Sequence, residues 1–290
     1  GSLSKKLSKV FVERGGELLL HTEAVKISQR KKRISHITVH NKLENEMYKI
    51  CPKWVVCNSE LTSLVEIVNS TCNTYKKYKS NIKQRKAEIS ALTFFLGLSI
   101  DLKDLGIMNT GVWNSRIQEE SVVKSPVDPI LNPDPLLYPH FYYTIYSNFD
   151  SSLAPIGKSN ITAFFYAKRD MFDKAIKDDG NRKGKSYTFL KKDLANNFIT
   201  ALSNDLNIAD LKKYVEVIEV GTPISNIHFT KNHNGSCFGW DMVPGQMMDN
   251  QMTQVTPFKN LFLAGQWTFP GGGVPTVMVS GINAANMVPV

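Results

Sequence analysis

The first sixty residues alternate between apolar and polar positions in patterns that predict one helix followed by several strands. Apolar residues at helical spacing predict a helix over residues 3–14, which Gly15 and Gly16 end. Short apolar or alternating runs then predict four strands, at residues 17–22, 24–29, 34–40 and 54–57. The last run is uninterrupted and bounded by turn residues, which is typical of a strand buried in a layered α/β domain.

The middle of the chain has the pattern of an antiparallel sheet. Aromatic and β-branched runs predict strands at residues 91–98, 140–147, 161–166 and 215–220, with a proline-rich loop over 126–135. Residues 61–90 look helical, and residues 186–207 predict a helix with one apolar stripe. The final segment predicts a buried strand over 261–264, a tight turn at three glycines and a helix over 277–287.

This order of elements predicts a mixed α/β and α+β fold with two domains. Residues 1–60 and 236–290 are expected to form one α/β domain that is discontinuous in sequence. Residues 61–235 are expected to form a second domain around the antiparallel sheet. Such an insertion places both chain ends in the same domain.

Composition narrows the classes of partner. The chain has 35 Lys and Arg residues against 26 Asp and Glu residues, and this net charge of +9 favours anionic partners such as phosphates or acidic lipid. No apolar run is long enough to span a bilayer, so any membrane contact is expected to be peripheral. Four cysteines without a C-x-x-C pair favour a reducing compartment, and we therefore expect a cytoplasmic protein. Composition says nothing of the oligomeric state.

Three further patterns in the sequence bear on metal, nucleic-acid or substrate binding. His228 and His233 have no cysteine or carboxylate cluster at ligand spacing, so no metal site is expected. The basic tetrad over 30–33 is typical of a solvated hairpin turn, and no nucleic-acid partner is expected. The aromatic run over 138–146 fits either the wall of a substrate tunnel or the packing of a sheet.

The most informative segment is residues 260–285, which combines a strand, a glycine turn and a helix. Backbone N–H groups at the start of a helix are free of intrahelical bonds and favour negative charge. Glycines let a ligand approach such a backbone without a Cβ in the way. The segment therefore suits a phosphate, or a flavin edge on which negative charge develops during reduction. Glycine content alone favours the plainer interpretation, a sharp strand-to-helix turn of any α/β protein.

The order Ala-Gly, Pro-Gly-Gly-Gly-Val-Pro, Ser-Gly and Ala-Ala in this segment resembles the C-terminal flavin motif of the phytoene desaturase, carotenoid isomerase and retinol saturase family. The resemblance implies FAD as cofactor and a backbone N–H from Val274, beside Gly272 and Gly273, to the isoalloxazine edge. It places Gly265 and Gln266 near the ribityl–phosphate part. Thr276 departs from the family, in which Gly or Ala is common.

Further segments resemble the same family in the same order along the chain. The stretch over 15–27 is similar to the family segment before its adenine-contacting strand, which implies that the backbone of Val25 pairs with the adenine edge. The strand over 54–58, the turn over 149–158 and the stretch over 234–240 also resemble family segments. The resemblance covers most of the chain, and the final motif is its most specific part.

The family's opening unit of strand, G-x-G-x-x-G and helix does not occur in this sequence. The resemblance therefore implies an incomplete FAD/NAD(P)-binding Rossmann-like domain with an inserted antiparallel-sheet substrate domain. It implies an FAD-dependent oxidoreductase, here truncated, that acts on carbon–carbon bonds of a long apolar substrate such as a carotenoid or retinoid. A non-catalytic lipid- or protein-binding remnant and an amine oxidase-like flavoenzyme are the alternatives. No catalytic acid or base is assigned.

Overall fold

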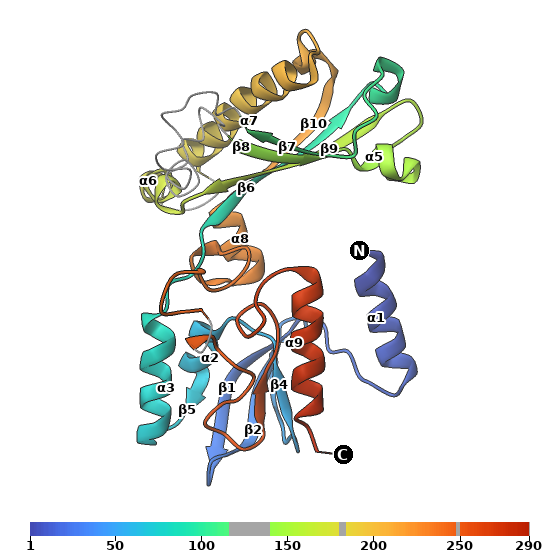
Figure 1. The fold of residues 1–290 in the computed structure, drawn as a ribbon. Helices are drawn as coiled ribbons and strands as arrows, with labels where there is room; N and C mark the ends of the chain where they lie inside the picture. Colours follow the sequence, from blue (N-terminus) through green and yellow to red (C-terminus); the bar gives the residue numbers. More distant parts are fainter. Residues whose placement is uncertain (116–139, 180–183, 248–249, 290) are drawn as a thin grey trace. The chain divides into compact units, whose positions relative to one another are not determined.

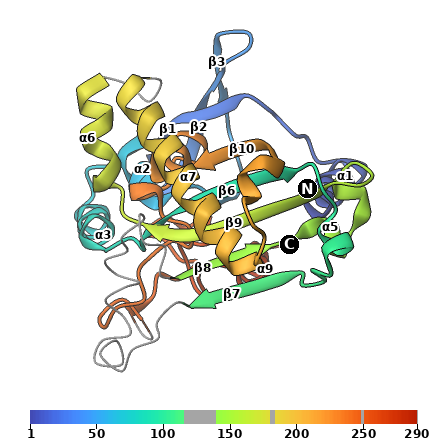
Figure 2. The ribbon, with the colours of Figure 1, turned by 90° about the horizontal axis from the view of Figure 1, so that it is seen from above.

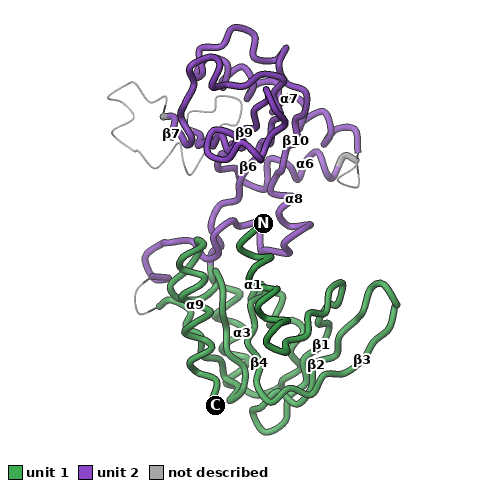
Figure 3. Tube along the Cα trace, turned by 90° about the vertical axis from the view of Figure 1, so that its right-hand side faces the viewer, with its two compact units in different colours: residues 1–85, 248–290 green, residues 86–247 purple. Residues whose placement is uncertain are grey.

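The computed structural model describes residues 1–115, 140–179, 184–247 and 250–289. The chain divides into two compact units, of which unit 1 comprises Gly1–Arg85 and Met248–Val290 and unit 2 comprises Lys86–Met247 (Figure 3). The proline-rich loop expected over 126–135 lies outside the described residues.

The boundaries of the units differ from those expected from the sequence, at 60 and 236. The helices after residue 60 pack in unit 1, where the Tyr75 hydroxyl donates a hydrogen bond to the Val65 carbonyl (2.8 Å) and the Tyr75 ring lies 5.4 Å from that of Phe258. Residues 236–247 stay with unit 2, because the Glu88 N–H donates to the Gly239 carbonyl (2.9 Å). The division of flavin and substrate roles between the units stays a prediction.

Unit 1 contains a four-stranded sheet and a parallel pair of strands (Figure 1). The four-stranded sheet has the order β3-β2-β1-β5, with β1 to β3 antiparallel and β5 parallel to β1. The strands of unit 1 are β1 (Thr22–Arg30), β2 (Arg33–Asn41), β3 (Glu46–Ile50), β4 (Val55–Cys57), β5 (Val68–Asn69) and β11 (Leu261–Leu263), the last paired with β4. The helices are α1 (Ser2–Glu13), α2 (Leu61–Ile67), α3 (Asn73–Gln84) and α9 (Val274–Asn286).

The expected first helix is confirmed, but the strand expected over 17–22 is wrong. Residues 17–19 form no strand among the described residues, residues 20–21 are a turn that leads into β1 at Thr22, and Leu18, Leu19 and Leu20 are exposed. Strand β3 was not expected, and all five of its residues are exposed in the structure. Helix α1 likewise has no buried residue.

One buried side chain joins the two sheets of unit 1. Asn260, 1% exposed, accepts a hydrogen bond from the Ile34 N–H (2.7 Å) and donates to the Ile34 carbonyl (3.0 Å) and the Lys53 carbonyl (3.2 Å). Its own carbonyl accepts from the Val55 N–H (2.8 Å). Asn260 therefore fixes β2 against the β4–β11 pair immediately before the glycine-rich segment begins.

Unit 2 is built on a five-stranded antiparallel sheet of order β10-β6-β9-β8-β7, and helix α7 covers one face of it (Figure 2). Its strands are β6 (Ser90–Leu98), β7 (Gly111–Ser115), β8 (His140–Thr144), β9 (Ser159–Ala167) and β10 (Val215–Gly221). Its α-helices are α5 (Tyr146–Phe149), α6 (Asp170–Asp179), α7 (Lys185–Leu206) and α8 (Pro223–Thr230). Short 3-10 helices are η1 (Leu102–Leu105), η3 (Ser151–Leu153), η4 (Leu211–Tyr214) and η5 (His233–Gly235).

The core of unit 2 lies between the sheet and α7. Residues of β9 alternate strictly between buried and half-buried, as expected of a strand with one covered face. Phe198 of α7 stacks on Phe94 of β6, with ring centroids 4.3 Å apart, and meets Phe141 edge-on at 5.5 Å. Phe141 and Tyr143 are buried, so these two members of the aromatic run pack the sheet. The strand expected over 140–147 ends at residue 144, where the chain turns into α5.

Candidate functional site

The candidate site is formed by the end of β11, the glycine turn after it and the first turn of α9, all within unit 1 (Figure 1). After β11 the chain turns at Gly265, whose φ of +93° is a conformation that residues with a side chain rarely adopt. A Cβ at this position would overlap Oδ1 of Asn58, which follows β4. Glycine is therefore required here by backbone geometry and by the neighbouring strand.

The glycine turn leads directly into α9. Gly273, with φ of +109°, is the N-cap residue of the helix, and no side chain caps the free N–H groups of its first turn. The helix begins at Val274, and its first turn carries no acidic residue. Uncapped N–H groups in a first turn that carries no acidic residue favour a ligand with negative charge.

Thr276, the departure from the family pattern, stabilises this turn. Its hydroxyl donates to the carbonyl of Gly272 (2.6 Å) and lies within hydrogen-bond distance of the carbonyl of Gly273 (2.8 Å). A Cβ added at Gly273 would lie 3.1 Å from the same hydroxyl oxygen. The Thr276 hydroxyl therefore contacts the carbonyl groups of the glycine turn that precedes it.

A buried polar cluster holds α9 against the end of β11. The hydroxyl of Ser280, which is fully buried, accepts a hydrogen bond from the Gly265 N–H (3.0 Å) and lies 2.7 Å from the Thr268 hydroxyl. The Thr268 hydroxyl also lies 3.2 Å from the Gly265 carbonyl. The amide of Gln254 donates to the Phe269 carbonyl. These contacts fix the loop between Gly265 and the helix.

The sequence interpretation did not single out this cluster. The available signal in the sequence was one serine, Ser280, within a mostly apolar helical segment. Its partners Thr268 and Gln254 are recognised only once the structure shows that they are buried. A polar side chain on the buried face of a helix needs a hydrogen-bond partner, and here the partner is the backbone of the preceding turn.

The structure places the remaining predicted residues in the same unit. Val274 is 62% exposed at the start of α9. Gln266 is half-buried, and its Nε2 atom is buried without a hydrogen-bond partner among the described residues. Val25 lies where the register of β1 against β2 shifts, between the pairs Ala24↔Val39 and Lys26↔Thr38, so it has no partner residue in β2. None of these observations identifies a ligand by itself.

The geometry fits the FAD that the sequence resemblance implies. Gly271 has open space beside its Cα atom, and Gly273 opens a helix whose N–H groups are uncapped. Gln266 offers an unpaired buried amide next to the turn, and Val25 offers backbone outside the β1–β2 ladder. Among the described residues, no group of three or more metal-ligating side chains is present, and no helix is long and apolar enough to cross a membrane.

Comparisons with known proteins show that this arrangement of elements also occurs in solved structures. No protein-family model matches the chain. Two solved structures match almost its whole length with a TM-score of 0.53. They are an oxidoreductase from Methanosarcina mazei (13% identity, 97% of this chain and 52% of that one) and the PF1083 protein from Pyrococcus furiosus (14% identity, 99% and 51%). At these identities the match shows the fold alone, which is mixed α/β as expected.

Two curated proteins are similar in sequence. All-trans-retinol 13,14-reductase from Danio rerio is 25% identical over 196 residues, which is 61% of this chain and 30% of that protein. A 4,4'-diapophytoene desaturase from Methylomonas sp is 21% identical over 291 residues, which is 99% of this chain and 52% of that protein. The chain is thus similar to the phytoene desaturase and retinol saturase group, as its motifs indicated, and spans about half or less of these relatives.

Proposed function

We propose that unit 1 contributes to an FAD site and that the chain belongs to an FAD-dependent oxidoreductase acting on carbon–carbon bonds of a long apolar substrate. The observation that carries this proposal is the first turn of α9. Gly273 caps the helix with positive φ, the N-cap position makes no side-chain cap hydrogen bond in the part of the chain that the structure describes, and Ser280 fixes the turn to the end of β11. Such a turn can accept a ligand edge at the backbone itself.

Each predicted residue has a role in this proposal. The Val274 N–H would face the isoalloxazine edge, and Gly272 and Gly273 would allow the ring to approach the backbone. Gln266, with its unpaired amide, would donate to an oxygen of the ribityl–phosphate part. Bound FAD would accept or deliver a hydride at the substrate carbon, while the protein supplies orientation and electrostatics.

Val25 would hold the adenine end of the cofactor through its backbone. A residue at a register shift has backbone groups outside the regular ladder, which suits hydrogen bonding to a base edge. Gly265 would lie beside the ribityl–phosphate part, at the turn that Ser280 holds against α9. The flavin-edge, ribityl and adenine contacts would then all come from unit 1.

The substrate class follows from what the curated relatives are named for. One is named a retinol reductase and the other a diapophytoene desaturase, and both substrates are long polyene chains. An apolar polyene is therefore the substrate class that we propose. Its oxidation, reduction and isomerisation are all open to a flavin scaffold of this kind.

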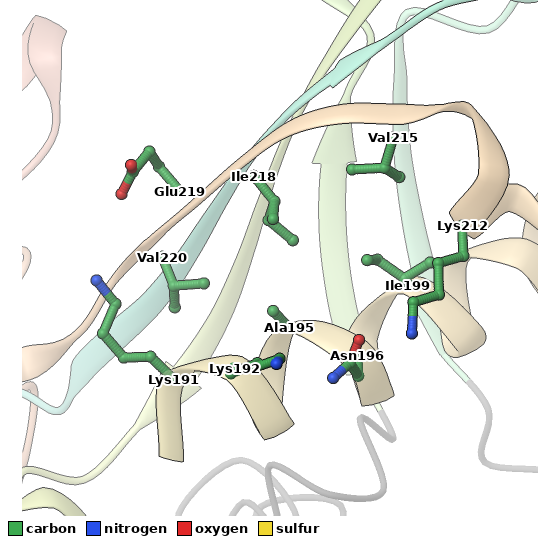
Figure 4. A pocket seen from close by; sticks show the side chains of 10 residues that line it. All are labelled: Lys191, Lys192, Ala195, Asn196, Ile199, Lys212, Val215, Ile218, Glu219 and Val220. Carbon is green, nitrogen blue, oxygen red and sulfur yellow. The ribbon is translucent and has the colours of Figure 1, made fainter. Parts of the chain in front are cut away.

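A long apolar substrate dissolves in lipid, and we propose that the protein meets it by peripheral contact with an acidic membrane. Unit 2 has a cavity of about 380 Å³ between α7 and β10, with Val215 and Ile218 among its apolar walls (Figure 4). Lys191, Lys192 and Lys212 line the same cavity. Together with the net charge of +9, these side chains favour anionic lipid headgroups.

A non-catalytic binding protein is the second candidate function. The observation that favours it is the lack of a G-x-G-x-x-G phosphate cradle in this sequence. The two candidates differ in redox behaviour. The test supplies an upstream dinucleotide-binding unit, fused ahead of Gly1 or as a separate chain, and adds FAD, oxidised in one sample and reduced with dithionite in another. Flavin absorbance is then followed anaerobically with a polyene such as diapophytoene or all-trans-retinol. A change in both flavin and polyene spectra supports the enzyme, and unchanged spectra with retained polyene support the binding protein.

A further inference from the structure

A second cavity in unit 2 carries chemistry that the flavin proposal does not use. It has a volume of about 710 Å³ and lies where the first residues of β6 meet the start of α6 and the segment around Asn234 and Asp241. Its walls combine aliphatic residues, Ala87 and Ile89, with acidic and basic side chains. All of its lining residues belong to unit 2.

Ion pairs account for several of the charges in this cavity. The Lys86 Nζ atom lies 3.0 Å from a carboxylate oxygen of Asp241. The Arg169 Nε atom lies 3.2 Å from a carboxylate oxygen of Asp173. Each of these four groups therefore has a counter-charge of its own before any ligand is considered.

Glu88 differs from the other acidic residues in the cavity. Its carboxyl group accepts a hydrogen bond from the Phe238 backbone N–H, but Oε2 is buried without a hydrogen-bond partner among the described residues. No ion pair of Glu88 occurs within the part of the chain that the structure describes. A buried carboxyl oxygen without a partner is unfavourable unless the group is neutral or a ligand completes it.

The surroundings favour the neutral form of this carboxyl group. Burial, and then the neighbouring charge of Asp241, raise the pKa of Glu88 to about 7, against the lowering effect of the Phe238 N–H. Burial raises the pKa of Cys237 to about 12 and also raises the pKa of Tyr166, and Glu88 adds to both shifts. Both groups are therefore neutral near pH 7, and Glu88 is the one of the three whose charge changes there.

We propose that this cavity binds the terminal hydroxyl of an otherwise apolar alcohol, and that the Glu88 carboxylic acid donates a hydrogen bond to the hydroxyl oxygen. A cationic ligand would meet Lys86 and Arg169, and an anionic ligand would meet Asp170, Asp173 and Asp241. A neutral oxygen avoids both repulsions and supplies the partner that Oε2 lacks. The aliphatic walls suit a hydrocarbon tail.

That the hydrocarbon tail is a polyene rests on the proposed function. The contact between Glu88 and a hydroxyl oxygen is independent of the proposed function. The inference therefore narrows the substrate class to an isoprenoid alcohol, in preference to a pure hydrocarbon. Its test needs no flavin, so binding at Glu88 and redox turnover can fail separately.

The experiment titrates the 290-residue chain with all-trans-retinol and follows retinol fluorescence at pH 6 and pH 8. With a pKa of about 7, the donor form of Glu88 falls from about nine-tenths to about one-tenth of the molecules between these pH values. Apparent affinity follows the fraction of the competent form, so we expect binding about tenfold weaker at pH 8. Axerophthene, the hydrocarbon that lacks the hydroxyl, should bind without this dependence on pH.

Two variants assign the effect to Glu88. Glu88→Gln keeps a donor that does not titrate, and retinol affinity should become equal at the two pH values. Asp241→Asn removes the charge that raises the Glu88 pKa, so the midpoint of pH-dependent binding should move to lower pH. Glu46→Gln changes an exposed acid on β3 of unit 1, outside both cavities of unit 2, and should behave as the parent chain. Equal retinol affinity at pH 6 and 8 in the parent chain, or a tenfold dependence that persists in Glu88→Gln, would overturn the proposal.

Discussion

Replacing Ser280 with alanine tests whether the buried hydroxyl holds the candidate flavin turn in place. The Ser280 hydroxyl is fully buried and accepts the Gly265 N–H at 3.0 Å. It also lies 2.7 Å from the Thr268 hydroxyl and 3.4 Å from the amide of Gln254. The Ser280→Ala change removes one oxygen and leaves the helix backbone intact.

The expected loss can be estimated from the groups left without a partner. The Gly265 N–H would become a buried donor without an acceptor, which costs about 1–3 kcal/mol. The Thr268 hydroxyl keeps the Gly265 carbonyl at 3.2 Å, so it adds little. Alanine is the better helix former, by about 0.5 kcal/mol, which offsets part of the loss. The net destabilisation of unit 1 should therefore be about 1.5 kcal/mol.

Two measurements check this estimate. Urea unfolding gives the change in the free energy of unfolding, and hydrogen–deuterium exchange of the peptide over 261–268 reports the opening of the turn. Ser80→Ala, on the exposed face of α3, is the matched control and should change stability by less than about 0.5 kcal/mol. A Ser280→Ala chain with the stability of the control and unchanged protection of the Gly265 amide would refute the reasoning.

Two further changes test the hydrogen bonds of Asn260 in unit 1 and the lysine-lined cavity between α7 and β10 in unit 2. Asn260→Leu leaves two backbone carbonyls and one N–H without their buried partner and should destabilise unit 1 by about 3 kcal/mol in urea unfolding, with β2 losing exchange protection first. Charge reversal at Lys191, Lys192 and Lys212 should weaken sedimentation with phosphatidylserine vesicles and remove its sensitivity to salt, whereas unchanged sedimentation would exclude this cavity as the lipid contact (Figure 4).

The glycine-rich segment shows what sequence can predict. Its strand, turn and helix were expected from local patterns, and the structure has β11, positive φ at Gly271 and Gly273, and α9 beginning at Val274. Such features are local, because the spacing of glycines and apolar residues specifies them within a few positions. The expected helix start at 277 was three residues late, since the pattern could not show that Gly273 itself caps the helix.

The features that sequence missed depend on long-range partners. Asn260 bonds to Ile34, 226 residues away, and neither residue is unusual in its own segment. Residues 17–21 have the composition of a strand, but within the described structure none of them pairs with another strand, and Leu18, Leu19 and Leu20 stay exposed. The sequence likewise did not single out Glu88 as a candidate site residue, because only the fold buries its carboxyl group beside Asp241.

The central claim is that the turn before α9 contacts the flavin, and flavin retention by a matched pair of glycine variants tests it most directly. The chain is combined with an upstream dinucleotide-binding unit, loaded with FAD, freed of unbound cofactor and measured by flavin absorbance, beside the chain alone. Gly273→Leu adds a side chain where the ring is expected, whereas Gly15→Leu adds one at another positive-φ glycine of unit 1 with open space around it.

We expect the combined protein to retain FAD in stoichiometric amount and the 290-residue chain alone to retain little, because the doubly charged pyrophosphate lacks its glycine-rich helix. Gly273→Leu should lose the flavin and Gly15→Leu should keep it, with far-UV circular dichroism unchanged in both. Equal flavin occupancy in the two variants, or tight stoichiometric FAD on the chain alone, would contradict these expectations.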